Sequence, residues 1–275
     1  MKIDLHTHSY YSDGVLSPKE IVEKAVNAKC DFLSLTDHDS VEGLTEASKY
    51  SKYLDLGFIN GVEISAKHNS QSIHIVGLGI NPKETTLIEG LQKNNNFRIE
   101  RAKKISEGLF KAGINKAYEK ASLISQTKYI TRTHFAQMLI QEKICPNMSS
   151  VFKKYMTGNK PGSVKGEWAS SKEVINWIHK AGGLAILAHP LRYRMTLTKL
   201  KKIVNELMLL GLDGLEIVNS YSRSEDIKIT KMIADENKLL YSSGSDYHGW
   251  SNQTIELGGT PEYDFGRKSV INFLR

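Results

Sequence analysis

The sequence has little cysteine and no long hydrophobic segment. Among its 275 residues only Cys30 and Cys145 are cysteines, and neither belongs to a CxxC pair. This argues against a disulfide scaffold and a cysteine zinc site, and it predicts a reducing compartment. No run of about 18 apolar residues occurs, so we expect no association with a membrane. The N-terminus also lacks the apolar region of a signal peptide, so we predict a cytoplasmic location.

Internal repeats and low-complexity tracts are absent as well. Hydrophobic residues make up 40% of the chain and charged residues 24%, a balance typical of soluble globular proteins rather than disordered or fibrous ones. A chain of 275 residues fits one barrel-sized domain, with or without an insertion, or two small domains.

Positive charge is concentrated in one segment. From Leu91 to Lys165 there are 15 Lys and Arg but only 4 Asp and Glu, whereas the rest of the chain has 22 basic and 26 acidic residues. A basic segment attracts nucleic acid or an anionic substrate. A solvated helical surface with lysines for solubility explains the charge equally well.

Short apolar runs alternate with helical patterns, which predicts a parallel α/β architecture. Seven predicted strands favour a barrel over an open sheet. The strands are Ile3–Leu5, Phe32–Thr36, Phe58–Ile64, Ile73–Leu78, Leu184–Ala188, Leu215–Val218 and Leu239–Tyr241. Capping residues and glycine stops support helices between them. The helices are Pro18–Val26, Ser171–Ala181, Lys199–Leu210 and Glu225–Asn237.

Two features depart from regular alternation. Only about eight residues separate Ile64 from Ile73, too few for a crossover helix, so these strands should form a hairpin that distorts the barrel. The segment 86–165 contains helices in a row without strands, which predicts an inserted helical subdomain. We therefore predict a barrel formed by residues 1–85 and 166–275, with a basic helical insertion over 86–165 as a substrate cap. Its predicted helices are Leu87–Phe110, Lys116–Ser125, Thr133–Glu142 and Ser150–Met156.

Histidines and carboxylates recur at or near the ends of the predicted strands. Polar residues within apolar strands, such as Glu63 and His74, cost several kcal/mol unless they are paired or bind a ligand. In α/β barrels the active site assembles at the C-terminal ends of the strands. By contrast, His68 and His179 fit ordinary surface or structural roles. The nine candidate metal ligands are His6, His8, Asp13, His38, Glu63, His74, His189, Asp246 and His248.

Imidazole and carboxylate ligands without thiolate suit zinc, manganese or iron in a hydrolytic site. Nine ligands exceed the needs of one metal, but they suffice for two or three divalent ions if a carboxylate such as Glu63 bridges. Clustered divalent ions activate water and hold a phosphoryl group during in-line displacement. The pattern therefore indicates metal-dependent phosphoester hydrolysis.

The ordered motifs resemble the PHP (polymerase and histidinol phosphatase) superfamily. They are Asp4-Leu-His-Thr-His, Ser12-Asp-Gly, Thr36-Asp-His-Asp, Gly61-Val-Glu, His74, Ala188-His-Pro and Gly244-Ser-Asp-Tyr-His. The resemblance implies a distorted (βα)7 barrel with a trinuclear metal centre, in which Glu63 bridges the first two metals. The implied sites are His6, His8, Glu63 and Asp246; Glu63, His74 and His189; and Asp13, His38 and His248.

Further motifs are similar to the TrpH, or RNase AM, group within this superfamily. They are Thr131-Arg-Thr-His-Phe-Ala, Gly158-Asn-Lys-Pro-Gly, Glu167-Trp-Ala-Ser and His189-Pro-Leu-Arg-Tyr. This resemblance implies removal of the 3′-phosphate from nucleoside 3′,5′-bisphosphates, or 5′-to-3′ degradation of 5′-phosphorylated RNA. The implied reaction is attack of a metal-activated hydroxide on phosphorus, with manganese as the leading metal candidate and iron or zinc as alternatives.

Six further residues are candidates for catalysis or substrate binding. Asp37 or Asp39 is expected to assist proton transfer or to hold His38 by a hydrogen bond. Arg132 and His134, at the predicted start of a helix, are assigned to a substrate phosphate.

For Arg192 we expect either contact with a substrate phosphate or an ordinary surface position. For Tyr193 we expect either stacking on a base of the substrate or packing in the core.

Three other functions are alternatives to this one, and a feature of the sequence argues against each. A small-molecule phosphomonoesterase such as histidinol phosphatase needs no basic insertion. A DNA-polymerase-associated nuclease would require a polymerase region that this sequence does not contain. A non-catalytic, metal-stabilised nucleic-acid binding module would not need the complete ligand set. No obligate protein partner is indicated.

Overall fold

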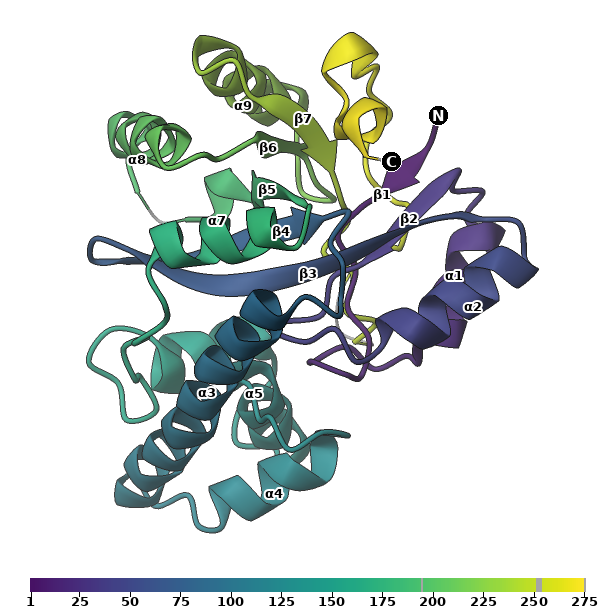
Figure 1. Cartoon of the computed structure of the whole chain (residues 1–275). Helices are drawn as coiled ribbons and strands as arrows, with labels where there is room; N and C mark the ends of the chain where they lie inside the picture. Colours follow the sequence, from purple (N-terminus) through teal and green to yellow (C-terminus); the bar gives the residue numbers. More distant parts are fainter. Residues whose placement is uncertain (194, 251–253, 275) are drawn as a thin grey trace.

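The computed structural model describes residues 1–193, 195–250 and 254–274. Within this part, seven strands form one sheet in the order β1-β2-β3-β4-β5-β6-β7 (Figure 1). The chain just after β7 lies beside the chain just after β1, because Asp246 N–H donates to His6 O at 2.8 Å. The sheet is therefore a nearly closed barrel. The strands are β1 Ile3–Asp4, β2 Phe32–Leu35, β3 Gly57–His68, β4 Gln71–Leu78, β5 Leu184–Leu187, β6 Gly214–Val218 and β7 Leu240–Ser243.

The predicted hairpin is confirmed and accounts for the distortion of the barrel. β3 and β4 pair antiparallel from Gly61 opposite Leu78 to His68 opposite Gln71. β4 also pairs antiparallel with β5, whereas the remaining neighbours are parallel. One strand of the barrel therefore runs opposite to the others.

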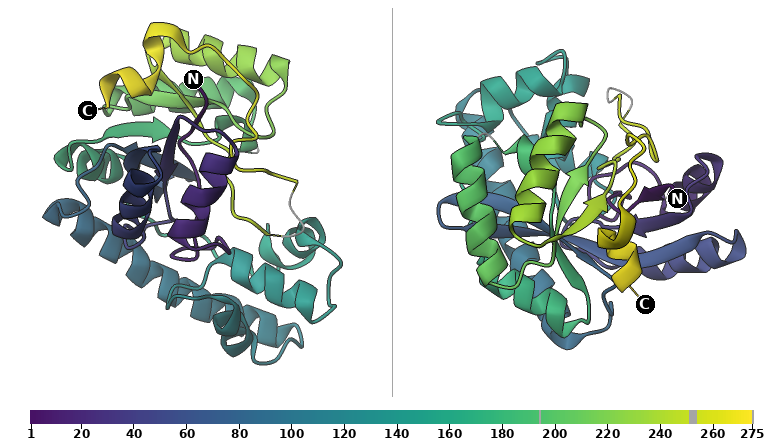
Figure 2. Two further views of the ribbon diagram at one scale, coloured as in Figure 1. Left: turned by 90° about the vertical axis from the view of Figure 1, so that its right-hand side faces the viewer. Right: turned by 90° about the horizontal axis from the view of Figure 1, so that it is seen from above.

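In the described part of the chain, five helices pack on the outside of the barrel (Figure 2). α1 begins as predicted, with the Ser17 side chain accepting from Glu20 N–H and Pro18 in the first turn. α2 escaped the sequence analysis because its cap residue Gly43 offers no side chain and its buried face includes the small residues Ala47 and Ser51. The five helices are α1 Pro18–Asn27, α2 Leu44–Tyr53, α7 Ser171–Lys180, α8 Leu197–Leu209 and α9 Ser224–Glu236.

The helices between β4 and α7 form a separate layer at one end of the barrel, which we call the helical cap (Figure 1). Its side chains build their own apolar core, which includes Leu109, Phe135, Leu139 and Met156. The predicted distorted barrel with an inserted helical subdomain is confirmed, while the domain boundaries at 86 and 165 stay a prediction. The cap consists of α3 Thr85–Lys111, α4 Ala117–Ile124, α5 Arg132–Gln141, α6 Met148–Val151 and a π-helical turn Phe152–Met156.

No helix in the described ranges combines the length and the apolar character that a membrane crossing requires.

Candidate metal centre

The nine predicted ligand residues converge at the end of the barrel that faces the cap. Those that follow parallel strands meet there because the C-terminal ends of such strands share one edge. His6 and His8 follow β1, and His38 follows β2. His74 departs from this rule, because β4 runs antiparallel and its first half, rather than its end, reaches the centre.

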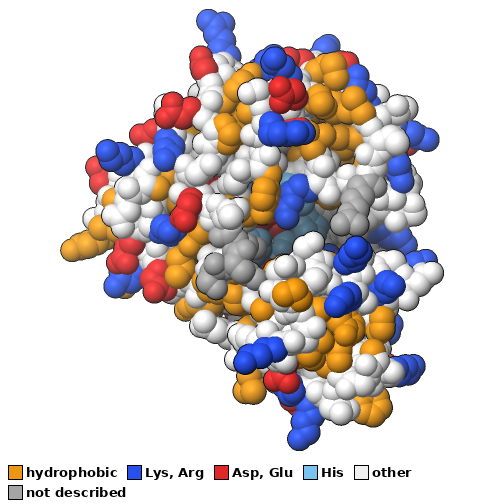
Figure 3. Space-filling model, turned by 180° about the vertical axis from the view of Figure 1, so that it is seen from behind, with side chains coloured by type: hydrophobic (Ala, Val, Ile, Leu, Met, Phe, Trp, Pro, Cys, Tyr) orange, Lys and Arg blue, Asp and Glu red, His pale blue; other side chains and the backbone are white. Residues whose placement is uncertain are grey.

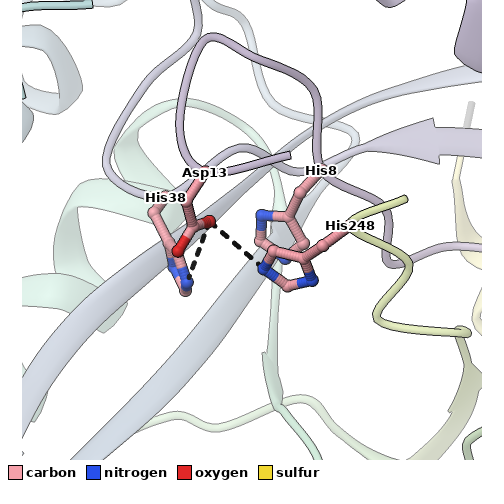
Figure 4. A group of neighbouring side chains, drawn as sticks. All are labelled: His8, Asp13, His38 and His248. Atoms are coloured by element: carbon pink, nitrogen blue, oxygen red, sulfur yellow. Dashed lines mark ion pairs between the residues drawn. The ribbon is translucent and has the colours of Figure 1, made fainter. Parts of the chain in front are cut away.

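These residues form three overlapping groups, and within each group the potential ligand atoms lie within 4.8 Å of one another. The groups are His6, His8, Glu63 and Asp246; His38, Glu63 and His74; and His8, Asp13, His38 and His248. Figure 4 shows the third group, in which Asp13 Oδ1 lies 3.1 Å from His248 Nε2 and 3.9 Å from His38 Nε2. His189 reaches the centre through Glu63, with 3.1 Å between His189 Nε2 and Glu63 Oε1.

Several buried polar atoms of the centre make no hydrogen bond of acceptable geometry among the described residues, although some of them lie within ion-pair distance of one another. Each such atom costs about 1–3 kcal/mol, so a fold retains a cluster of them where a ligand satisfies them. Nitrogen and carboxylate oxygen donors without thiolate fit divalent ions such as manganese, iron and zinc. The atoms are His6 Nε2, His8 Nε2, Asp13 Oδ1, His38 Nδ1, Glu63 Oε2 and His189 Nδ1.

The carboxylates of the centre are held in their ionised form. Burial raises the pKa of Glu63, but the charges of His38 and His74 outweigh it and hold the pKa well below its usual range. Burial likewise opposes the ionisation of Asp246, while the Arg192 guanidinium beside it lowers the pKa strongly. Ionised carboxylates are the form that coordinates a metal.

Glu216 is a buried residue of the centre that the sequence analysis missed. It lies on β6 with its Oε2 2.8 Å from His6 Nδ1, and it is 2% exposed. A hydrogen bond from His6 Nδ1–H to this carboxylate leaves the Nε2 lone pair of His6 to face the centre. An acidic residue within the apolar run Leu215–Val218 was the signal that could have revealed it, as it did for Glu63.

Asp37 and Asp39 are both buried, and neither is among the described residues that line the cavities at the centre. Asp37 accepts hydrogen bonds from Ser9 N–H at 2.8 Å and from the Ser12 hydroxyl at 2.7 Å. It thereby fixes the turn that carries Asp13.

Asp39 joins the barrel to the cap. Its Oδ2 accepts from Arg98 Nε–H at 2.8 Å and also from Arg98 Nη2–H, and its Oδ1 accepts from Asn94 Nδ2–H at 2.8 Å. Asn95 Nδ2–H donates to its backbone oxygen at 2.8 Å. Three side chains of α3 therefore converge on this one loop residue, and the carboxylate faces the cap.

A cavity of about 760 Å³ opens directly over the centre, within the 300–1,000 Å³ range of small-molecule sites. Figure 3 shows it as a hollow with histidine at its base and Lys and Arg side chains beside it. Of the predicted substrate residues, Arg132, Arg192 and Tyr193 line it. The Tyr193 hydroxyl accepts from His74 N–H at 2.9 Å and donates to Ala188 O at 3.1 Å, so it also ties ligand-bearing segments together.

His134 is not among the residues that line this cavity. Its Nδ1 accepts from Thr131 N–H at 3.0 Å, and the Thr131 hydroxyl donates to Asp13 Oδ2 at 3.1 Å. Burial lowers the pKa of His134 to about 4, with the Asp13 carboxylate opposing and the Arg98 charge adding to the effect. A neutral His134 therefore caps α5 and positions Arg132 at the start of that helix.

A smaller compartment of about 80 Å³ adjoins the centre beside Asp13, His38 and His74. Arg98, Arg101 and Arg132 line it together. Burial and the charges of Arg132 and Arg98 lower the pKa of Arg101 to about 9. Only Asp39 pairs with one of these cations among the ion pairs of the described residues, so the compartment has an excess of positive charge.

The sequence analysis found the charge of this segment but missed Arg98 and Arg101 individually. Both lie on α3, whose 27 residues carry charges on several faces, and no local signal marks the face that packs inward. The Trp168 ring packs against both guanidinium groups, with its centroid 4.9 Å from Arg98 Cζ and 5.3 Å from Arg101 Cζ.

The ligand cluster and the barrel that carries it define a family. A family model described as PHP domain matches residues 4–185, and the chain belongs to the PHP family. The resemblance and the prediction of a hydrolase are thus confirmed.

Three known proteins are similar to this chain over nearly its whole length. The chain is 38% identical over 261 residues to a protein of Chromobacterium violaceum named 3′,5′-nucleoside bisphosphate phosphatase, covering 94% of this chain and 92% of that one. It is 39% identical over 260 residues to a 5′-3′ exoribonuclease of Haemophilus influenzae, covering 94% and 93%. A solved structure of an amidohydrolase from Chromobacterium violaceum, with bound sulfate and no metal, superposes with a TM-score of 0.95 at 36% identity, covering 100% of this chain and 96% of that one.

Proposed function

We propose that this protein is a metal-dependent phosphoesterase that hydrolyses the 3′-phosphate of nucleoside 3′,5′-bisphosphates and removes nucleotides from the 5′ end of 5′-phosphorylated RNA. One observation carries the substrate assignment. A compartment lined by Arg98, Arg101 and Arg132 adjoins a cluster of metal-ligating groups, so two phosphates of one nucleotide have two adjacent places to bind. The related phosphatase and exoribonuclease support the same assignment.

Both substrates undergo the same reaction at one bond. Water adds to phosphorus and the 3′ oxygen leaves with a proton, which releases inorganic phosphate from a bisphosphate or a nucleoside 5′-phosphate from RNA. In RNA the phosphate stays on the following nucleotide, which becomes the new 5′ end. A single site that reads a 5′-phosphate and cleaves at the 3′ oxygen therefore serves both substrates.

The nine residues of the centre would hold two or three divalent ions, with manganese as the first candidate and iron or zinc as alternatives. When bound, such ions lower the pKa of water and neutralise charge on a phosphoryl group. Glu63 contacts His6, His38, His74 and His189, which supports it as the carboxylate that two ions would share. Glu216 fixes the orientation of His6.

The arginines bind and orient the substrate. Arg132 and Arg101 would each contribute charge-assisted hydrogen bonds to a 5′-phosphate, while Arg98 is already held by Asp39. Arg192 forms an ion pair with Asp246 and lines the open cavity, which supports a contact between Arg192 and the phosphate that is cleaved. His134 acts indirectly, by holding the first turn of α5.

Proton transfer by Asp37 or Asp39 is not part of this proposal. Both carboxylates are occupied by hydrogen bonds to the Ser9–Ser12 turn or to α3, and neither lines the cavity. We assign them positioning roles.

Phosphate and nucleotide release tests the proposal. Metal-free protein is reconstituted with manganese and offered adenosine 3′,5′-bisphosphate and a 5′-phosphorylated short RNA. Histidinol phosphate is the control substrate, and His38→Ala is the blank. Metal-dependent release from the nucleotides, lost in the variant, supports the proposal. Release from histidinol phosphate alone moves the assignment to a small-molecule phosphatase, and binding of metal without any release supports a non-catalytic module.

A further inference from the structure

Tyr221 is a large aromatic side chain left half exposed at the mouth of the catalytic cavity. It follows β6 at the C-terminal end of the barrel, lines the cavity of about 760 Å³ and is 50% exposed. Its backbone N–H donates to Asn219 Oδ1 at 3.0 Å, and Asn219 N–H donates to Ser222 Oγ at 3.0 Å. The turn that presents the ring is therefore held in place before any ligand arrives.

Arg192 links this ring to the metal centre. Its guanidinium forms an ion pair with Asp246 and has its Cζ 5.2 Å from the centroid of the Tyr221 ring. A cation stacked on an aromatic ring beside a phosphate site is an arrangement that single-stranded nucleic-acid binding surfaces use for backbone and base together.

The side chains proposed to bind substrate line two adjacent spaces. Arg98 and Arg101 line only the small compartment, on the side of Asp13, His38 and His74. Tyr221 and Arg192 line only the open cavity, and Arg192 pairs there with Asp246. Asp13, His38 and His74 line both spaces, whereas Asp246 and His189 line only the open cavity, so the metal-ligating cluster adjoins both sets.

These two spaces allow a 5′-phosphorylated RNA to bind in one direction. If its terminal phosphate is bound in the small compartment and its next phosphate at the ligand cluster, the chain beyond that phosphate continues toward Asp246. A nucleoside 3′,5′-bisphosphate ends at that phosphate and has nothing to place there. In this arrangement RNA reaches the region around Tyr221, whereas the free bisphosphate does not.

We propose that Tyr221 is the stacking platform for the base of the second nucleotide, the one that follows the cleaved phosphate, and that it sets the preference for RNA over free bisphosphate. This inference rests on the proposed function. It predicts that one exposed ring changes the substrate preference without changing the bond that is cleaved.

The experiment compares three substrates on manganese-reconstituted protein: a 5′-phosphorylated RNA trinucleotide, the same RNA without a base on its second nucleotide, and adenosine 3′,5′-bisphosphate. The variants are Tyr221→Ala and Tyr221→Phe, and the matched control is Tyr53→Ala, which truncates a tyrosine that is 83% exposed at the end of α2. The readout is kcat/KM for each substrate.

Tyr221→Ala is expected to lower the ratio of kcat/KM for RNA to kcat/KM for bisphosphate about tenfold, the size of one lost base–aromatic stack. Removing the second base should cost the wild type a similar factor and should cost Tyr221→Ala less than about twofold, because the partner ring is already gone. Tyr221→Phe, which keeps the ring, and Tyr53→Ala should both retain the wild-type ratio.

An unchanged ratio in Tyr221→Ala overturns the inference, as does a base-removal penalty that persists in that variant. A wild-type protein that hydrolyses bisphosphate but not RNA also overturns the inference and leaves the phosphatase function standing. A wild-type protein that hydrolyses neither nucleotide overturns the proposed function itself, so the two failures are distinguishable.

Discussion

Replacing Asp39 by Asn removes one negative charge from the junction between barrel and cap while keeping the shape of the side chain. Asp39 is fully buried and has a positive φ of 49°, a backbone conformation that asparagine tolerates well. Backbone strain therefore does not contribute to the effect. What changes is the partner of Arg98, which is itself 7% exposed.

The magnitude follows from the contacts of the carboxylate. Oδ1 accepts from Asn94 and from Ser65 N–H at 3.1 Å, while Oδ2 accepts from Arg98. An asparagine side chain has one acceptor oxygen and one NH2 group. Both oxygens of Asp39 accept hydrogen bonds, so in either orientation the NH2 group of asparagine faces other donors. Leaving a buried cation without its counter-charge costs about 3–5 kcal/mol. At about 2–4 °C per kcal/mol, we expect the Tm to fall by about 10 °C.

The assay is thermal and urea unfolding of metal-free protein, so that metal affinity does not enter the result. Asp55→Asn is the matched control, because Asp55 also has a positive φ, 53°, but is exposed. We expect that control to change stability by less than about 0.5 kcal/mol. If Asp39→Asn keeps the wild-type Tm yet loses more than about a thousandfold in kcat, the positioning role is wrong and proton transfer by Asp39 regains support.

Three further predictions concern the metals, the arginine compartment and the buried histidine. Chelation should abolish hydrolysis and lower the Tm, and manganese at 100 times its Kd should restore about 2.7 kcal/mol of stability for each ion bound; a Tm indifferent to metal would contradict a metal-binding role for the cluster. Arg101→Met should lower kcat/KM about 10- to 100-fold for 5′-phosphorylated substrates but far less for the same substrates with a 5′-hydroxyl group. The control Lys103→Met, on the exposed side of α3, should leave kcat/KM unchanged for both kinds of substrate. Equal losses on both substrates in Arg101→Met would rule out a 5′-phosphate contact. Burial holds the pKa of His134 at about 4, below about 6.5 for an unfolded histidine, so its neutral form contributes stability that is full above pH 6.5 and is lost as the pH falls through 4. Wild-type protein should therefore lose up to about 3 kcal/mol over this interval relative to His134→Gln in metal-free urea unfolding, and parallel pH profiles would refute the assignment.

The sequence by itself predicted a seven-stranded barrel, its hairpin and the nine candidate ligand residues. Alternating apolar runs are local signals, and eight residues between Ile64 and Ile73 leave room only for a turn. Histidines and acids within apolar strands stand out because burial without a partner is costly, and their positions in such strands mark Glu63 and His74 as candidate ligands. The recognition did not extend to Glu216, although the same reasoning applies to it.

Only the tertiary structure decided which polar groups face the cavity and which support it from behind. Asp37, Asp39, Arg98 and Arg101 look alike in sequence as charged residues beside motifs or on a long helix. The packing of α3 across the barrel mouth turns Arg101 toward the ligand cluster and commits Asp39 to Arg98. Such contacts join residues about 60 positions apart, so no local periodicity encodes them. The direction of each side chain is set by the surface against which its element packs.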